Sequence, residues 1–292
     1  MTSTQSKPQT NLGFGFVQSL AGELSSGKID LPSFPEVATR IRQLLNDPQA
    51  AVDQVVRLVG SEPALAARLM LVANASSFNR TGKQITDLRT AINRIGHSMV
   101  RSAAMAFALS QLRRGAKLDK LQARLNKLWQ RSTQIAALAY VLARTCSTVN
   151  PDEALLAGMM HGIGKLYIMT RAAQHPQLFT DHETLDEILG DWHASIGKAI
   201  LENWEFPESM SSAVGEQDDH GREDEETDQP DLRDIVAIAI LMSAYSTDIS
   251  NLELALNGLP AARRLGLDQT RIRTVMQECA AEVSALSAAL GS

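Results

Sequence analysis

Hydrophobic residues recur at helical spacing along almost the whole 292-residue chain. One stripe follows three- and four-residue steps through Leu118, Leu121, Leu125, Leu128, Ile135, Ala139 and Leu142. This spacing places the side chains on one face of a long helix. A second stripe runs through Ile272, Val275, Met276, Cys279, Val283 and Leu286. Strand patterns, in which hydrophobic and polar residues alternate, are missing. The pattern predicts an all-α fold of about a dozen short helices.

Capping residues and prolines indicate where several helices begin. Asn150 is followed by Pro151, a combination that is typical of a helix N-terminus. Ser61 stands in a similar position before the segment EPALAARLMLVA. Three other prolines mark further predicted helix starts: Pro35, Pro207 and Pro260.

Two breaks in composition divide the chain. The segment RRGAK at 113–117 separates two helical patterns and is a predicted hinge, whereas 216–231 carries nine acidic residues against one arginine. Such an acidic run buries too little surface to offset its ordering entropy, so it is predicted to be a solvated, mobile loop. We expect an N-terminal extension with a helix at 1–27, a helical N-terminal subdomain at 28–114 and a second helical subdomain at 115–292.

Composition restricts the class of protein. Hydrophobic residues make up 44% of the chain, enough for a full core, and the net charge of −5 argues against a nucleic-acid surface. The two cysteines, Cys146 and Cys279, lie far apart in predicted helices; they give neither a disulfide framework nor a CxxC metal-binding pair and are expected to be small core residues. No apolar run reaches the roughly 18 residues of a membrane span, and the polar N-terminus lacks a leader pattern. A soluble cytoplasmic protein, without nucleic-acid or membrane partners, is expected.

Candidate chemistry centres on AGMMHGIGKLYIM, residues 157–169. His161 ends a predicted apolar helix, and the glycines at 162 and 164 allow the backbone to approach whatever lies beside it. No histidine pair has the HExxH spacing that puts two metal ligands on one helical face. A histidine in this place is more often a hydrogen-bonded core residue than a ligand. Lys165 is a candidate for anion binding, against the alternative of an ordinary solvated or locally paired lysine.

The order of several motifs resembles the HDOD family, the bacterial HD-related output domain. The segments that carry the resemblance are LPSFPEVATRIRQLLND, SEPALAARLMLVANASSF, ITDLRTAINRIGHSMVRSAAMAFAL, LWQRSTQIAALAYVLAR, EALLAGMMHGIGKLYI and DWHASIGKAILENWEFPESMSSAV. They cover roughly residues 28 to 218. The resemblance implies a multi-helical HD-like fold with a helical N-terminal subdomain, related to metal-dependent phosphohydrolases.

The resemblance also shows where this chain departs from a catalytic HD site. Arg131 in LWQRS stands where the related helix often has a histidine, and the His-Asp doublet is His161 followed by Gly162. His193 in DWHASIG is retained, but the later histidine-rich segment is replaced by acidic residues from Glu216. Glycine supplies no donor and arginine stays protonated, which leaves two donors where a zinc-type site takes three or four. The resemblance, with these departures, implies no catalytic metal and no cofactor.

Other interpretations of the same residues stay open. His161 and His193 could be completed by a carboxylate, to hold one Mn or Fe ion; the candidates are Asp191, Glu216 and Asp218. A metal-dependent phosphohydrolase acting on a nucleotide or cyclic dinucleotide would need such a site.

The expected function is that of a non-catalytic bacterial signal-transduction module that acts through protein contacts. No receiver, diguanylate cyclase or kinase segment accompanies the helical motifs, so its input is expected from a partner or ligand in trans. A third alternative is a small-molecule sensor that uses the former active-site cleft between the subdomains. Arg131, His161 and Lys165 are the residues expected to line it, with Arg131 able to accept an anion such as phosphate.

Overall fold

A computed structural model of the chain describes residues 9–26, 36–45, 47, 51–79, 81–115, 121–173, 175, 178, 182–220, 229–278 and 280–291. Within those ranges the secondary structure is helical and contains no strand, which confirms the predicted all-α class. The helices of the first half are α1 (Gln9–Ser25), α2 (Glu36–Leu45), α3 (Val52–Gly60), α4 (Pro63–Asn74) and α5 (Leu88–Gly115). Those of the second half are α6 (Gln122–Cys146), α7 (Pro151–Met160), α8 (Ile163–Ala172), α9 (His182–Asn203), α10 (Glu208–Gly215), α11 (Leu232–Ala244), α12 (Ile249–Leu256), α13 (Pro260–Arg264), α14 (Gln269–Glu278) and α15 (Ala280–Gly291).

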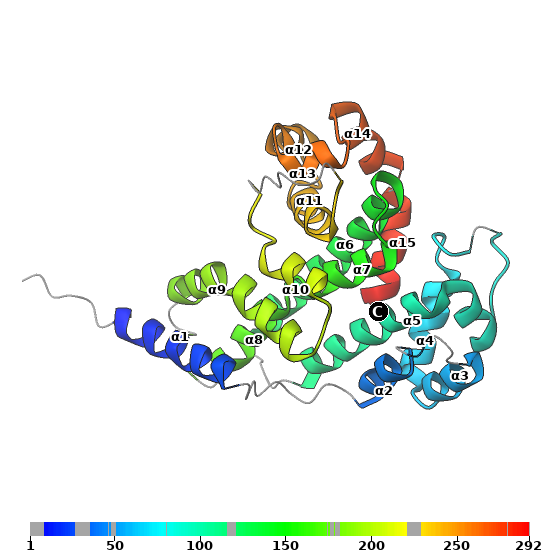
Figure 1. Ribbon diagram of the computed structural model, residues 1–292, viewed down its shortest axis with the longest axis horizontal. Helices are drawn as coiled ribbons and strands as arrows, with labels where there is room; N and C mark the ends of the chain where they lie inside the picture. The colour runs from blue at the N-terminus through cyan, green and yellow to red at the C-terminus, as the bar shows by residue number, and fades with distance from the viewer. Residues whose placement is uncertain are drawn as a thin grey trace, which may run out of the picture.

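The long helix α5 organises the first half. Helices α2, α3 and α4 all pack against it at one end of the molecule (Figure 1). Its regular geometry is interrupted at Gly96, which has φ 78° and ψ 165°. Residues with a side chain rarely adopt this positive φ, so glycine permits the bend. The hydrophobic pattern alone gave no sign of this interruption.

Helix α6 is the centre of the second half. Residues 135–143 are buried on every face of the helix, as expected of a helix surrounded by others. Helices α7, α11 and α15 pack around it, and Figure 1 shows α15 running alongside it. Helices α8, α9 and α10 follow α7; α8 carries the second part of the histidine motif, and α9 carries His193. The core is one continuous cluster that includes residues from both halves of the chain.

The described part of the N-terminal extension forms helix α1, which packs against the second half of the chain. Phe16 and Leu20 are buried, and helix α1 contacts α9. The carboxylate of Glu23 forms an ion pair with Arg171 and accepts a hydrogen bond from the hydroxyl of Tyr167 at 2.5 Å. Of the predicted hinge, 113–115 belong to α5, whereas 116 and 117 lie outside the described residues.

Most of the predicted helix starts are correct. The Asn150 side chain accepts a hydrogen bond from the backbone N–H of Asp152 at 2.9 Å, with Pro151 as the first helical residue of α7. Pro207 and Pro260 stand at the starts of α10 and α13, and Pro35 lies outside the described residues. The prediction for Ser61 is wrong: Glu62 precedes α4, while the Ser61 hydroxyl donates to the carbonyl of Leu58 at the end of α3.

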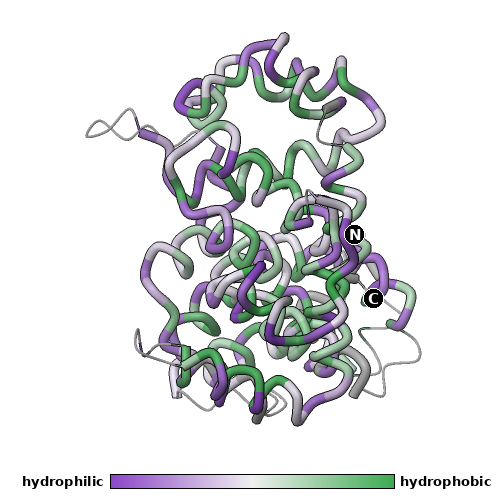
Figure 2. Tube along the Cα trace, turned by 90° about the vertical axis from the view of Figure 1, so that its right-hand side faces the viewer, coloured by the Kyte–Doolittle hydropathy of each residue, from purple (hydrophilic) through white to green (hydrophobic). Residues whose placement is uncertain are grey.

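The two predicted hydrophobic stripes both lie on helices of the structure, but the second stripe is divided between two helices. The first belongs largely to α6, although Leu118 lies outside the described residues. The second is shared between α14 and α15, and Cys279, where they meet, is also outside them. Figure 2 shows hydrophobic and hydrophilic residues alternating along most of the helical trace, as amphipathic packing requires. Among the described helices, none has the length and hydropathy of a membrane span.

Candidate functional site

The histidine motif forms a tight turn between two buried helices. Helix α7 ends at Met160, His161 follows it, and α8 begins directly after Gly162. At Gly158 in α7, an added Cβ would lie 2.8 Å from the Cα of Ala136 in α6. At Gly164 in α8, an added Cβ would lie only 1.9 Å from the carbonyl oxygen of His193 in α9. These glycines allow backbone-to-backbone contact, which brings α7 against α6 and α8 against α9 beside the two histidines.

His161 is a buried, neutral histidine. Only 4% of its surface is exposed, and its Nδ1 donates a hydrogen bond to the carbonyl oxygen of Gly158 at 2.7 Å. Burial lowers the pKa of His161 from 6.5 to about 3, and the nearby positive charges of Lys165 and Arg131 also lower it. Because Nδ1 carries the proton, Nε2 keeps its lone pair. The backbone carbonyl of His161 accepts a hydrogen bond from the side chain of Gln217 at 3.1 Å.

His193 lies in the same cluster on α9. It is also 4% exposed, its Nδ1 donates to the carbonyl oxygen of Gly190 at 3.1 Å, and its Nε2 lies 3.3 Å from Oδ2 of Asp218. Burial lowers the pKa of His193, Lys165 lowers it further, and the Asp218 carboxylate acts in the opposite direction. His161 and His193 also influence each other electrostatically, so the structure brings the two histidines together as the resemblance implied.

Two positive charges adjoin these histidines. Lys165 is half-buried in the first turn of α8, and burial lowers its pKa, followed by the repulsion of Arg131. The Asp218 carboxylate partly compensates for both effects. Arg131 is exposed on α6 and is close enough to lower the pKa of both His161 and Lys165. Arg131, His161 and Lys165 therefore lie close to one another, and their role as the lining of a ligand cleft stays a prediction.

Gly162 stands at the aspartate position of the His-Asp doublet, and side chains of α6 lie directly beside it. An added Cβ at this position would lie 2.8 Å from Cδ1 of Leu128 and 3.2 Å from Oγ of Ser132, both on α6. An aspartate at 162 would therefore begin against a hydrocarbon side chain and would require the end of Leu128 to move. With an apolar group there and Arg131 near His161, the residues present do not fit the donor set of a hydrolytic metal centre.

The three carboxylates considered as further metal ligands do not converge on the two histidines. Asp218 faces His193. Glu216 instead forms ion pairs with Arg233 at 3.0 Å and with Lys198 at 3.8 Å, and Asp191 is exposed on α9. In the part of the chain that the structure describes, no three His, Cys, Asp or Glu side chains group as a metal site would require.

The start of the predicted acidic loop 216–231 differs from the expectation of a solvated segment. Gln217 is only 1% exposed, and its amide donates to the backbone carbonyls of His161 and Val214. At the other end, Asp231 caps α11 by accepting from the backbone N–H groups of Arg233 and Asp234. The acidic composition did not predict the buried Gln217 or the helix cap at Asp231, because capping and pairing use the same residue types as solvated loops. The stretch 221–228 lies outside the described residues, and its mobility stays a prediction.

Sequence reasoning missed Leu128 and Gln217, which complete the surroundings of the histidine turn. Leu128 belongs to the α6 stripe and looks like any core leucine. Gln217 lies among four charged or polar residues in GEQDDH. Only its position two residues after the end of α10 indicates that its side chain could bond to backbone carbonyls there.

The sequence profile of the HDOD domain matches residues 31–220, which is more than half of the chain. The chain belongs to the HDOD family. A protein of Treponema pallidum (strain Nichols), itself uncharacterized, is 22% identical over 209 residues, which cover 67% of this chain and 39% of that protein. The chain therefore spans well under half the length of that relative.

Solved structures of HDOD and HD-like proteins share the fold. A protein of Shewanella amazonensis SB2B, provisionally named a metal-dependent phosphohydrolase, is 26% identical with a TM-score of 0.74, covering 94% of this chain and 99% of that one. An HDOD domain protein of unknown function from Geobacter sulfurreducens is 24% identical with a TM-score of 0.65, covering 93% and 96%. A protein of Marinobacter aquaeolei VT8, provisionally named for signal transduction, is 20% identical with a TM-score of 0.64, covering 96% of this chain and 66% of that one.

Proposed function

We propose that this HDOD protein is a non-catalytic signalling module that acts through protein contacts. The observation that carries the proposal is Gly162: the position of the HD carboxylate supplies no donor, and Leu128 lies 2.8 Å from where its Cβ would begin. A hydrolytic metal centre needs several protein donors and an open position for water. The pair His161 and His193 falls short of that set.

The charges around the histidines favour the same conclusion. Arg131 and Lys165 lower the pKa of His161, so their positive charge acts where a divalent cation would have to bind. Repulsion between like charges in a buried setting weakens cation binding strongly.

Trp192 is the residue that we expect a protein partner to contact. It is 41% exposed on α9, directly next to buried His193. Exposed tryptophans are enriched among the residues that dominate binding energy at protein interfaces. A partner bound there would lie over the helix that carries His193, so the former site and the output surface would share one helix.

The experiment combines partner capture with a hydrolysis assay. Full-length protein is used to capture partners from a lysate of the source bacterium, followed by mass spectrometry, with Trp192→Ala as the test and Leu254→Ala, another exposed apolar residue, as the matched control. The proposal predicts a partner that Trp192→Ala loses and Leu254→Ala keeps. Hydrolysis of nucleotides or cyclic dinucleotides with Mn²⁺ that disappears in His161→Ala would contradict it and establish the phosphohydrolase instead.

A second candidate function is a small-molecule sensor that binds an anion at the histidine turn. Burial and, after it, the repulsion of Arg131 lower the pKa of Lys165; an anion beside the two cations would relieve that repulsion, which favours this candidate. This candidate predicts that nucleotides raise the melting temperature without being hydrolysed, since a ligand that binds only the folded state stabilises it. If Arg131→Ala leaves that stabilisation unchanged, the anion site is wrong.

A further inference from the structure

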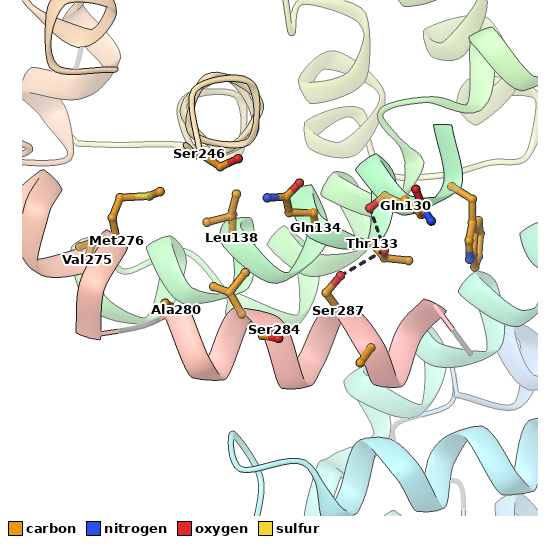
Figure 3. Close-up of a pocket in the computed structure, with 13 residues that line it drawn as sticks. Gln130, Thr133, Gln134, Leu138, Ser246, Val275, Met276, Ala280, Ser284 and Ser287 are labelled. Atoms are coloured by element: carbon orange, nitrogen blue, oxygen red, sulfur yellow. Dashed lines mark hydrogen bonds between the residues drawn. The ribbon is translucent and has the colours of Figure 1, made fainter. Parts of the chain in front are cut away.

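A cavity of about 610 Å³ lies between α6, the C-terminal helices α14 and α15, and the turn after α11. Leu138 on α6 forms an apolar wall together with Val275, Met276 and Val283, and Trp129 lines the cavity as well. Figure 3 shows α15 running below the cavity, with Ser246 above it. The lining includes Gln130 and Thr133, one and two residues from Arg131 in sequence, but neither His161 nor Lys165. This cavity is therefore separate from the histidine turn.

The lining is uncharged. None of the 13 described residues around the cavity is acidic or basic; they are apolar, hydroxyl or amide side chains. One charged pair joins the two helices that form its walls, because Arg144 of α6 forms an ion pair with Glu282 of α15, both partly buried, and neither residue lines the cavity. A charged ligand would find no counter-charge here, and moving an ion out of water without one is costly.

Gln134 gives the cavity a fixed hydrogen-bond donor. The Ser243 hydroxyl donates to Oε1 of Gln134 at 3.0 Å, which fixes the orientation of the amide. Figure 3 shows the amide nitrogen of Gln134 on the side of the cavity, and the described residues provide no acceptor for it. The hydroxyls of Ser287 and Thr133 already donate within the protein, the first to the Thr133 hydroxyl and the second to the carbonyl of Gln130.

We propose that this cavity binds a neutral small organic molecule with an apolar body and a hydrogen-bond acceptor, such as a carbonyl oxygen, that meets the amide of Gln134. Its volume falls in the range of about 300–1,000 Å³ that small-molecule sites occupy, and an apolar wall with a few polar groups is their usual lining. The ligand would join α15 to α6, the helix that also carries Arg131 and Leu128 of the histidine turn. The inference goes beyond the proposed function and does not depend on it.

The probe is Nile red, a neutral dye with a carbonyl acceptor whose fluorescence rises in apolar surroundings, titrated into the full-length protein. Ala280 and Ala281 provide a matched pair, because both are exposed alanines on α15 and only Ala280 lines the cavity. The proposal predicts saturable binding of one dye per chain, lost by at least tenfold in Ala280→Trp and unchanged in Ala281→Trp. Gln134→Met, which keeps the length of the side chain but removes the donor together with the acceptor of the Ser243 hydroxyl, should weaken binding about threefold to tenfold.

Three outcomes would overturn the proposal. The first is the absence of saturable binding to the wild-type chain. The second is an equal effect of the two tryptophan variants, which would place the dye elsewhere. The third is equally tight binding of the anionic dye anilinonaphthalene sulfonate with the same sensitivity to Ala280→Trp, because a charged molecule should be rejected.

Discussion

The backbone of Gly164 in α8 rests directly against the carbonyl oxygen of His193 in α9, so closely that a Cβ on Gly164 would lie 1.9 Å from that oxygen. No ordinary contact is this short, and the obstacle is backbone that cannot rotate away. The second glycine of the GIG sequence, Gly164, is thus required for packing, whether or not the site has a chemical role.

Gly164→Ala is therefore expected to destabilise the protein severely. Separating α8 from α9 would open the core around both histidines, and we expect the free energy of unfolding to fall by at least about 3 kcal/mol. Gly190→Ala is the matched control in α9: nothing lies within 4 Å of its added Cβ, so it should gain about 0.5–1 kcal/mol. Urea unfolding of both variants measures the difference, and equal stability would show that the two helices are less closely packed.

The stability of the protein should depend on pH through His161. In the folded chain its pKa is lowered from 6.5 to about 3, so the unfolded chain takes up the proton first as the pH falls. Stability is then lost progressively below about pH 6.5, by about 2 kcal/mol at pH 5 from this group alone. The raised pKa of Asp152, about 6, acts in the opposite direction because its folded form holds the proton more tightly.

A comparison of the wild type with a His161 variant separates the pH dependence due to His161 from that due to Asp152. Denaturant unfolding of the wild type and of His161→Gln at about pH 7.5 and about pH 5 gives the contribution of His161 as the difference between their pH dependences. We expect the wild type to lose about 2 kcal/mol more than the variant over this interval. Equal losses would mean that His161 is protonated as easily in the folded chain as in the unfolded one.

Gln217 should contribute to stability although it lies in an acidic segment. Its amide donates to the carbonyl of His161 at 3.1 Å and to that of Val214 at 2.8 Å. Gln217→Leu keeps the bulk but leaves buried carbonyls without this donor, a change that costs about 1–3 kcal/mol. Asp219→Asn, at an exposed position two residues further on, should change little. Thermal unfolding of the two variants distinguishes a buried Gln217 that stabilises the fold by hydrogen bonds from a residue in a solvated loop.

The sequence predicts the helical class, most helix starts and the grouping at the histidine turn. The helical stripes are clear because burial of α6 imposes them, and Asn150 with Pro151 identifies the start of α7 because capping uses a small set of residues. The proximity of His161, His193 and Arg131 was predictable only through the resemblance, since it arises from helices far apart in sequence.

Other features depend on tertiary contacts that local patterns do not record. Gly96 looks like a helical residue in sequence but has φ 78°. Ser61 has the composition of a cap for α4 but bonds to the end of α3. Glu216 is one of many acidic residues in its segment, and only the fold pairs it with Arg233. The uncharged lining of the large cavity is assembled from helices α6, α14 and α15 and has no signature in any one of them.

Metal content of the purified full-length protein tests the central claim most directly. The chain is expressed with Mn, Fe and Zn supplied, and the metal per chain is measured by inductively coupled plasma mass spectrometry for the wild type and His161→Ala. The account predicts far less than one equivalent of any transition metal, with no difference between the two proteins. About one equivalent per chain in the wild type, lost in His161→Ala, would contradict it.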